Sequence, residues 1–309
     1  MLDFDTIAKK CNLFDETDVE AVINNIASLD EQYSKEDLVE IYNYILTVCK
    51  NPDILMNTIR FADRFRFKST LNVLIDLLLM RTEADNVSLQ EKYVNVRSMC
   101  AKAIANYRDT EAVTPLLYCL NNKDEHYRVR LACADALGKI GDKYAVAPLI
   151  EVVKDESEKS VYLRESAASA LGLIGDLRAI DPLVSILETK QGLMNKFTFL
   201  KERVIEALAK LRLDDNDRVF HALKSSLDDE STQVRINAIE ALMESTHPEA
   251  AGAIKTCLSD NDEEVRKNAL IALYNIVGRD ILDEVISLPS YEKSLKEEAQ
   301  ALIEEYEND

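Results

Sequence analysis

Apolar residues recur every three or four positions along most of the chain, with polar residues between them. Six segments share one version of this pattern. In each, a basic residue is followed by small or apolar residues at positions +3, +6, +7 and usually +10. These positions lie on one stripe of a helix with about 3.6 residues per turn. The pattern therefore predicts six amphipathic helices, each with one buried face.

The six segments recur at an almost constant interval. Their basic residues are 33, 34, 37, 34 and 31 positions apart, at Arg97, Arg130, Arg164, Lys201, Arg235 and Arg266. An interval of this size accommodates one pair of helices, and repetition at such a period is typical of solenoids. Position +6 is alanine in every segment. Because alanine lets a neighbouring helix approach closely, we interpret this column as packing and expect Ala136 and Ala170 to be buried.

A second element begins eighteen residues after the basic residue in three segments, with proline followed by apolar residues. Proline is tolerated in the first turn of a helix because its missing N–H would have no partner there. These prolines, which predict helix starts, are Pro115, Pro148 and Pro182. The turn before each contains an aspartate that can cap the incoming helix and face a neighbouring basic side chain. These aspartates are Asp109, Asp142 and Asp176.

The stretch PLIEVVKDESEKSVYLRESAASALGLIGDLRAIDPLVSIL resembles HEAT repeats, particularly the subtype found in phycobilisome-lyase-like proteins. The resemblance covers about residues 93–280. It implies an all-α fold, an α-solenoid of the HEAT/armadillo type in which antiparallel helix pairs form a superhelix. It also implies a ladder of charges between adjacent repeats, formed by the repeated aspartates with Arg97, Arg130, Arg164 and Arg235.

We predict three regions. Residues 1–90 are divergent helical N-terminal repeats or a cap, with helices near 16–28, 35–49, 52–66 and 69–81. Residues 91–280 are the HEAT-repeat array, and residues 281–309 are a C-terminal capping helix that shields the end of the array. Two insertions, 82–92 and 189–197, are expected to lengthen loops. The second contains Gly192, Met194 and Phe197 and is a candidate docking loop.

Composition narrows the classes of partner. Lys and Arg number 37 against 56 Asp and Glu, so the net charge is −19 and nucleic acid is an unfavourable ligand. No apolar stretch approaches the length that crosses a bilayer, and the first residues lack the apolar core of a signal peptide. We therefore expect a cytoplasmic protein without membrane insertion. The six cysteines form no CxxC pair and are interpreted as reduced thiols, and the three in or beside alanine-rich helices are interpreted as small core residues.

Reactive side chains are scarce. There are three histidines, none with a second histidine at metal-ligand spacing, and no tryptophan. The chain is similar in length and repeat type to deoxyhypusine hydroxylase, a HEAT-repeat enzyme that holds two irons with His-Glu pairs. No such pair follows any of the six basic residues here, so that activity is rejected. No catalytic residue, metal or cofactor is predicted, which favours a protein that is not an enzyme.

One basic and aromatic run, residues 60–68, stands out from the acidic chain. Phe61 and Phe65 are four positions apart and are expected to belong to the core. The basic residues would then form a solvated face, and a docking patch is the alternative. They are Arg60, Arg64, Arg66 and Lys68.

In HEAT architecture the second helix of each pair lines the concave surface, where positions +1 and +5 would project. These positions bring together a row of acids: Asp135, Glu165, Glu202, Glu206 and Glu240. We expect this row to be either an ordinary solvated face or a groove that holds a basic segment of a protein partner. The sequence therefore predicts a protein-binding scaffold or adaptor. The alternative, which follows from the resemblance, is a phycobilin lyase-like or phycobilisome-associated protein that handles a bilin and its acceptor protein.

Overall fold

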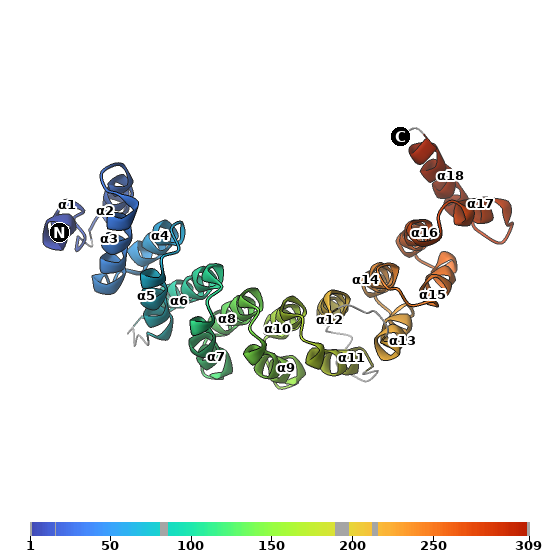
Figure 1. Ribbon diagram of the computed structural model, residues 1–309, viewed down its shortest axis with the longest axis horizontal. Helices are drawn as coiled ribbons and strands as arrows, with labels where there is room; N and C mark the ends of the chain where they lie inside the picture. Colours follow the sequence, from blue (N-terminus) through green and yellow to red (C-terminus); the bar gives the residue numbers. More distant parts are fainter. Residues whose placement is uncertain (1, 16, 81–85, 189–197, 212–215, 308–309) are drawn as a thin grey trace. The chain divides into compact units, whose positions relative to one another are not determined.

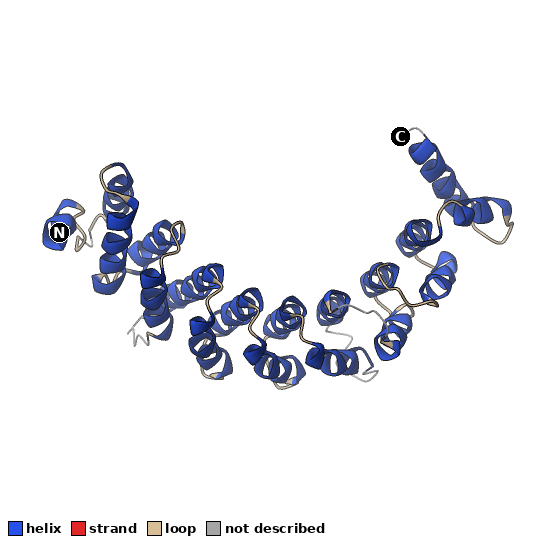
Figure 2. Ribbon diagram, viewed as in Figure 1, coloured by secondary structure: helices blue, strands red, loops and turns tan. Residues whose placement is uncertain are grey.

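The computed structural model describes residues 2–15, 17–80, 86–188, 198–211 and 216–307. Within these ranges the chain forms helices joined by turns, with no strand (Figure 2). The predicted all-α class and the solenoid of helix pairs are confirmed. The insertion at 189–197, with Gly192, Met194 and Phe197, lies outside the described residues, and its docking role stays a prediction.

The chain divides into two compact units, Met1–Val152 and Val153–Asp309. In unit 1, four inner helices pack one after another, and three outer helices cover one side of them (Figure 1). The inner helices are α2 (Val19–Ala27), α4 (Pro52–Asp63), α6 (Val87–Tyr107) and α8 (Tyr127–Ile140). The outer helices are α3 (Lys35–Val48), α5 (Lys68–Leu79) and α7 (Val113–Asn121). The short helix α1 (Phe4–Lys10) packs on α3, and α9 (Val146–Lys154) spans the boundary between the units.

Unit 2 repeats the same arrangement. Its inner helices pack in order, from α10 (Val161–Ile174) through α12 (Thr198–Lys210) and α14 (Thr232–Met243) to α16 (Glu263–Val277). The outer helices are α11 (Ile180–Glu188), α13 (Asp217–Ser226), α15 (Ala250–Thr256) and α17 (Asp280–Ser287). Beyond Pro289, α18 (Lys293–Glu307) packs on α16 and α17, so the helix predicted for the C-terminal segment is present.

The core of each unit lies between its inner and outer layers. All six alanines of the repeated column are buried, and Ala136 and Ala170 are only 0% and 1% exposed. The helical register inferred from the basic residues is therefore correct. The column brings inner helices close together, and at Gly172 of α10 an added Cβ would lie 2.7 Å from the Cα of Ala207 on α12.

The turns also follow the sequence pattern. Pro115, Pro148 and Pro182 each lie in the first turn of an outer helix. The aspartate before each proline caps a short 3-10 turn by accepting a backbone N–H two residues later, as Asp109 accepts that of Glu111. The carboxylate of Asp109 also lies 3.5 Å from Lys68 Nζ, which is the basic neighbour expected of these aspartates.

The first ninety residues contain the four helices expected from their apolar spacing, as α2 to α5. Their pairs continue both layers of unit 1. The expected loop at 82–92 is wrong for residues 87–92, because these residues form the start of the 21-residue helix α6. Asn86 caps this helix by accepting the backbone N–H of Ser88.

A charge ladder links successive helix pairs, but its acids differ from those expected. Arg97 binds both carboxylate oxygens of Glu125, and Arg235 binds both of Asp260 at 2.9 Å. Each acid lies in the loop between the outer and inner helices of the following pair. The expected aspartates, such as Asp109, lie instead in the turn that leads from an inner helix to the next outer helix. Lys201 with Asp229 and Arg266 with Glu292 follow the same rule.

The basic residues also bind the ends of outer helices. Arg130 and Arg164 donate their Nε–H groups to the backbone carbonyls of Leu120 and Val153, at 2.9 and 2.8 Å. These carbonyls lie in the last turns of α7 and α9, where helical C=O groups lack intrahelical donors. Each basic residue therefore fastens an inner helix to a neighbouring loop or helix end.

Candidate functional site

The five predicted acids are divided between the two units. Asp135 lies on α8 in unit 1, whereas the other four lie on three consecutive inner helices of unit 2. These are Glu165 on α10, Glu202 and Glu206 on α12, and Glu240 on α14. The helices of this group are in contact, so unit 2 brings four of the five predicted side chains onto one helical layer.

Glu165 is the most unusual of these acids. Its Oε1 atom is buried and has no hydrogen-bond partner. Burial raises the pKa of the carboxyl group, and nearby Arg203 only partly offsets this effect. A buried carboxylate oxygen without a donor is costly, and a cation from another molecule would relieve that cost.

Glu202 lies beside Glu165 and is a second carboxylate whose charged form is disfavoured. Burial raises its pKa, and the negative charges of Glu206 and Glu165 raise it further against the opposing effect of Arg203. Arg203 is already occupied, since its Nη1 lies 2.7 Å from Glu206 Oε2. This part of unit 2 therefore contains three mutually repelling carboxylates and one local guanidinium.

The acidic face continues onto α14. Glu206 and Glu240 line a cavity of about 280 Å³ between α12 and α14. Glu244 adds a third carboxylate and Lys210 contributes the basic group that lines it. Lys210 and Glu244 were not among the predicted site residues, because they lie outside the two columns that were read from the repeat. We name the set Glu165, Glu202, Glu206, Glu240 and Glu244 the acidic face of unit 2.

Asp135 has different surroundings. It lines a cavity of about 280 Å³ formed by α4, α6 and α8, together with three basic side chains and one further acid. The basic residues are Arg60, Lys102 and Lys139, and the acid is Asp63. Asp63 accepts hydrogen bonds from the amide of Asn106. The inner layer of unit 1 is thus mixed in charge around Asp135, in contrast to unit 2.

The basic and aromatic run at 60–68 makes contacts within unit 1. Arg64 donates to both carboxylate oxygens of Asp30, at 2.7 and 3.0 Å, and lies over the rings of Phe61 and Phe65. Asp30 also accepts the hydroxyl of the fully buried Tyr42. Lys68 pairs with Glu111. Phe61 and Phe65 are only half-buried, so they lie at the edge of the core beside the ring of Tyr42 and not within the core as expected. Arg64 and Lys68 pair with acids of unit 1.

Two of the three histidines accept backbone N–H groups near helix starts. His126 caps α8 by accepting the N–H of Arg128, and His247 accepts that of Glu249. His247 is also stacked on Phe220, with ring centroids 3.7 Å apart. In the described part of the chain, no group of three or more His, Cys, Asp or Glu side chains is arranged to hold a metal ion. None of its helices combines the length and the apolar character that a membrane span requires.

Solved structures of several proteins are similar to this chain. They include the phycocyanin lyase complex of CpcE and CpcF from Nostoc sp. PCC7120, at 24% identity over 76% of this chain and 87% of that one, with a TM-score of 0.46. Human deoxyhypusine hydroxylase is 17% identical over 88% of this chain and 95% of that one, with a TM-score of 0.35. A HEAT-like repeats protein from the archaeon Thermococcus onnurineus NA1 is 17% identical over 74% of this chain and 99% of that one, with a TM-score of 0.41.

Comparison with curated protein sequences finds no match. A family model of HEAT repeats, in contrast, matches residues 86–163, 124–196 and 220–302. The matched ranges span over half of the chain and contain five of the six repeated basic residues, all except Lys201. Together with the paired helices and the buried alanine column, they show that the chain belongs to the HEAT repeat family.

Proposed function

We propose that this HEAT-repeat protein is a non-catalytic scaffold and that the acidic face of unit 2 binds a basic segment of a protein partner. The observation that carries the proposal is the buried Oε1 of Glu165, which has no hydrogen-bond donor. It lies beside Glu202, whose charged form is also disfavoured. Such carboxylates gain more from an incoming cation than solvated ones, because desolvation has already taken place.

The expected partner is an extended segment with two or more Lys or Arg residues. One cation would interact with Glu165 and Glu202, and a second would enter the cavity lined by Glu206 and Glu240. The protein's net charge of −19 would accelerate encounter with such a segment at low salt. Binding should therefore weaken as the salt concentration increases.

Affinity purification followed by mass spectrometry identifies the partner, and charge reversal tests the surface. We expect the double variant Glu202→Lys/Glu206→Lys to weaken partner binding by about 100-fold or more, since each lost charged contact costs about 1.5–3 kcal/mol. The control is Glu297→Lys/Glu305→Lys, which makes the same charge change at exposed positions on α18. Equal affinities of the two double variants would refute the acidic face as the binding surface.

The alternative predicted from the sequence, a phycobilin lyase-like or phycobilisome-associated role, has its own test. A bilin added to the purified protein should show a shifted visible absorption spectrum if the protein binds it. A shift that persists in Glu202→Lys/Glu206→Lys would place bilin binding away from the acidic face and would replace the scaffold proposal.

A further inference from the structure

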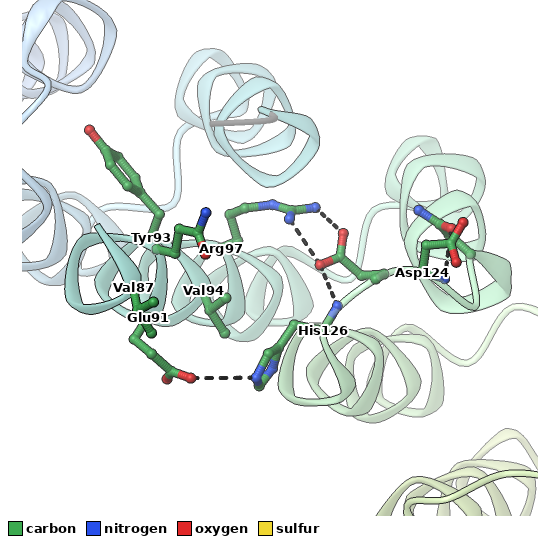
Figure 3. A pocket seen from close by; sticks show the side chains of 10 residues that line it. Val87, Glu91, Tyr93, Val94, Arg97, Asp124 and His126 are labelled. Carbon is green, nitrogen blue, oxygen red and sulfur yellow. Dashed lines mark hydrogen bonds and ion pairs between the residues drawn. The ribbon is translucent and has the colours of Figure 1, made fainter. Parts of the chain in front are cut away.

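A cavity of about 380 Å³ lies in unit 1 beside the first half of α6 (Figure 3). It arises because two neighbouring inner helices differ in length. Helix α6 begins ten residues before its basic residue Arg97, whereas α8 begins three residues before Arg130. The additional turns of α6 lie beside the loop that leads into α8, and the cavity lies between them.

Arg97 and Glu125 line the cavity as an ion pair, and both side chains are hydrogen-bonded to groups within the protein. Arg97 donates to both oxygens of Glu125, at 2.9 and 2.5 Å, and its Nε–H binds the carbonyl of Leu78. The two side chains are only 12% and 8% exposed. Glu125 also accepts the backbone N–H of His126. The guanidinium is therefore committed to partners within the protein, which disfavours an anionic ligand.

One wall presents a carboxylate with an available oxygen. Because His126 Nδ1 accepts the N–H of Arg128, the proton of the neutral ring is on Nε2. Figure 3 shows this ring facing Glu91, with 3.8 Å between Nε2 and Oε1, which is beyond hydrogen-bond distance. The other oxygen of Glu91 accepts from Arg128 at 2.9 Å. Oε1 can therefore accept a further donor.

The remaining walls combine charge with apolar surface. Asp124 lines the cavity from the loop before α8, across from Glu91. Val87 and Val94 line it from α6, and Val87 is 76% exposed. A long aliphatic side chain with a cationic end matches this lining, since its stem can cover the valines while its head lies near the carboxylates.

We propose that this cavity binds a lysine or arginine side chain of a protein partner. The site lies in unit 1 and uses none of the residues in the acidic face, so it stands or falls independently of the proposed function. It would give the scaffold a second contact point, and two linked contacts raise affinity through effective concentration.

Saturation-transfer NMR with capped amino acids tests the proposal in the full chain. The probe is Nα-acetyl-arginine amide, and its neutral match is the corresponding citrulline derivative. Both are titrated up to about 10 mM, because single side-chain contacts bind weakly. The measurements use the Glu202→Lys/Glu206→Lys protein, so that binding to the acidic face does not contribute.

Two changes address the cavity separately. Glu91→Gln/Asp124→Asn removes the charge of its walls, and Val94→Phe fills its space. The control is Glu151→Gln, an exposed acid on α9. We expect saturable arginine binding that falls about fivefold or more in both cavity variants and is unchanged in the control. Circular dichroism checks that each variant is folded, and either cavity variant alone suffices for the conclusion.

Three results would overturn the assignment. One is equal signals from the arginine and citrulline probes, and another is no saturable arginine binding. The third is arginine binding that folded cavity variants retain. Putrescine, a free diamine, serves as a competitor. If it displaced the arginine probe at a much lower concentration than lysine amide does, the ligand would be a small amine instead of a protein side chain.

Discussion

Gly172 shows how a single residue determines the spacing of two helices. Its α-carbon faces Ala207 on α12, and a Cβ at this position would lie 2.7 Å from the Ala207 Cα and 3.0 Å from its Cβ. Both contacts are shorter than van der Waals packing permits, and one of them is to the backbone. Helix α10 can therefore approach α12 this closely only because residue 172 has no side chain.

The substitution Gly172→Ala should destabilise the protein by about 1–3 kcal/mol, because overpacking outweighs the helix propensity that alanine gains. Gly252→Ala on α15 is the matched control, since an added Cβ there meets nothing within 4 Å. It should stabilise the protein by up to about 1 kcal/mol. Urea unfolding measures both, and a neutral Gly172→Ala would show that the helices can separate at little cost.

Glu165 should make stability depend on pH. Burial raises its pKa above the ordinary value of 4.5. Between the ordinary pKa of the unfolded chain and the raised pKa of the folded protein, the folded protein binds more protons than the unfolded chain. The free energy of unfolding therefore falls as the pH rises through this interval. Glu202 contributes in the same direction.

We therefore expect Glu165→Gln to unfold at a higher temperature than the wild type at pH 7 and to show a weaker loss of stability as the pH rises above 4.5. The gain should stay below about 1 kcal/mol because the side chain is partly exposed. Thermal unfolding followed by circular dichroism at several pH values measures it. Parallel pH profiles for the two proteins would contradict the origin assigned to the effect.

Among elements, the contacts of Arg235 show how one helix pair is fastened to the next. Its guanidinium makes two 2.9 Å hydrogen bonds to Asp260 and a third, of 2.8 Å, to the carbonyl of Asp229. Both side chains of the ion pair are largely buried, at 13% and 14% exposed. Arg218, in contrast, pairs with Asp181 on the surface.

Removing the buried cation should cost far more than removing the exposed one. We expect Arg235→Met to lower the free energy of unfolding by about 2–4 kcal/mol, because Asp260 keeps its charge in a partly desolvated place. Arg218→Met should cost less than about 1 kcal/mol. A double-mutant cycle with Asp260→Asn measures the coupling, and a coupling near zero would mean that this ion pair does not stabilise the junction.

The repeat pattern predicted the helices well because the burial of one stripe constrains every turn. Ala136 and Ala170 occupy the expected places, as do the capping aspartates. The acids of the ladder were missed because their distance from the basic residue varies, from Arg97 to Glu125 and from Arg235 to Asp260. A column comparison at fixed spacing cannot detect them.

The start of α6 was missed for a related reason. Residues 87–92 do not repeat in the other segments, so their additional length was assigned to a loop, and the cavity beside them could not be foreseen. The absence of a hydrogen-bond donor to the buried Oε1 of Glu165 could not be foreseen either, since it depends on which groups lie nearby in space. The sequence identified four acids of unit 2, but the structure was needed to show which of them lack partners.

In the molecule as a whole, all six cysteines are buried thiols that form no disulfide with one another. Burial raises the pKa of Cys257 to about 11 and also raises that of Cys100. Cys119 differs, because a hydrogen bond from Cys133 lowers its pKa. Since the thiolate is the reactive form, these residues report unfolding rather than surface chemistry.

Ellman's reagent should label fewer than one thiol per native chain within minutes, at about pH 8. All six should react in denaturant. Under mild destabilisation we expect Cys119 to react first, as the α7–α8 pair opens. Mass spectrometry of the labelled peptides identifies the site. Fast labelling of several cysteines in the native protein would contradict the core described above.

In unit 2 the ion pairs of Lys201, Arg235 and Arg266 run in one direction, from the basic residue of one helix pair to an acid supplied by the following pair. A segment of DNA that encodes one complete period carries one donor and one acceptor, so its duplication or loss leaves every remaining link intact. Partial duplications leave an unmatched charge. Such proteins can therefore gain or lose complete helix-pair repeats. To lengthen this scaffold by design, a complete repeat should be inserted at the same position within the repeat each time.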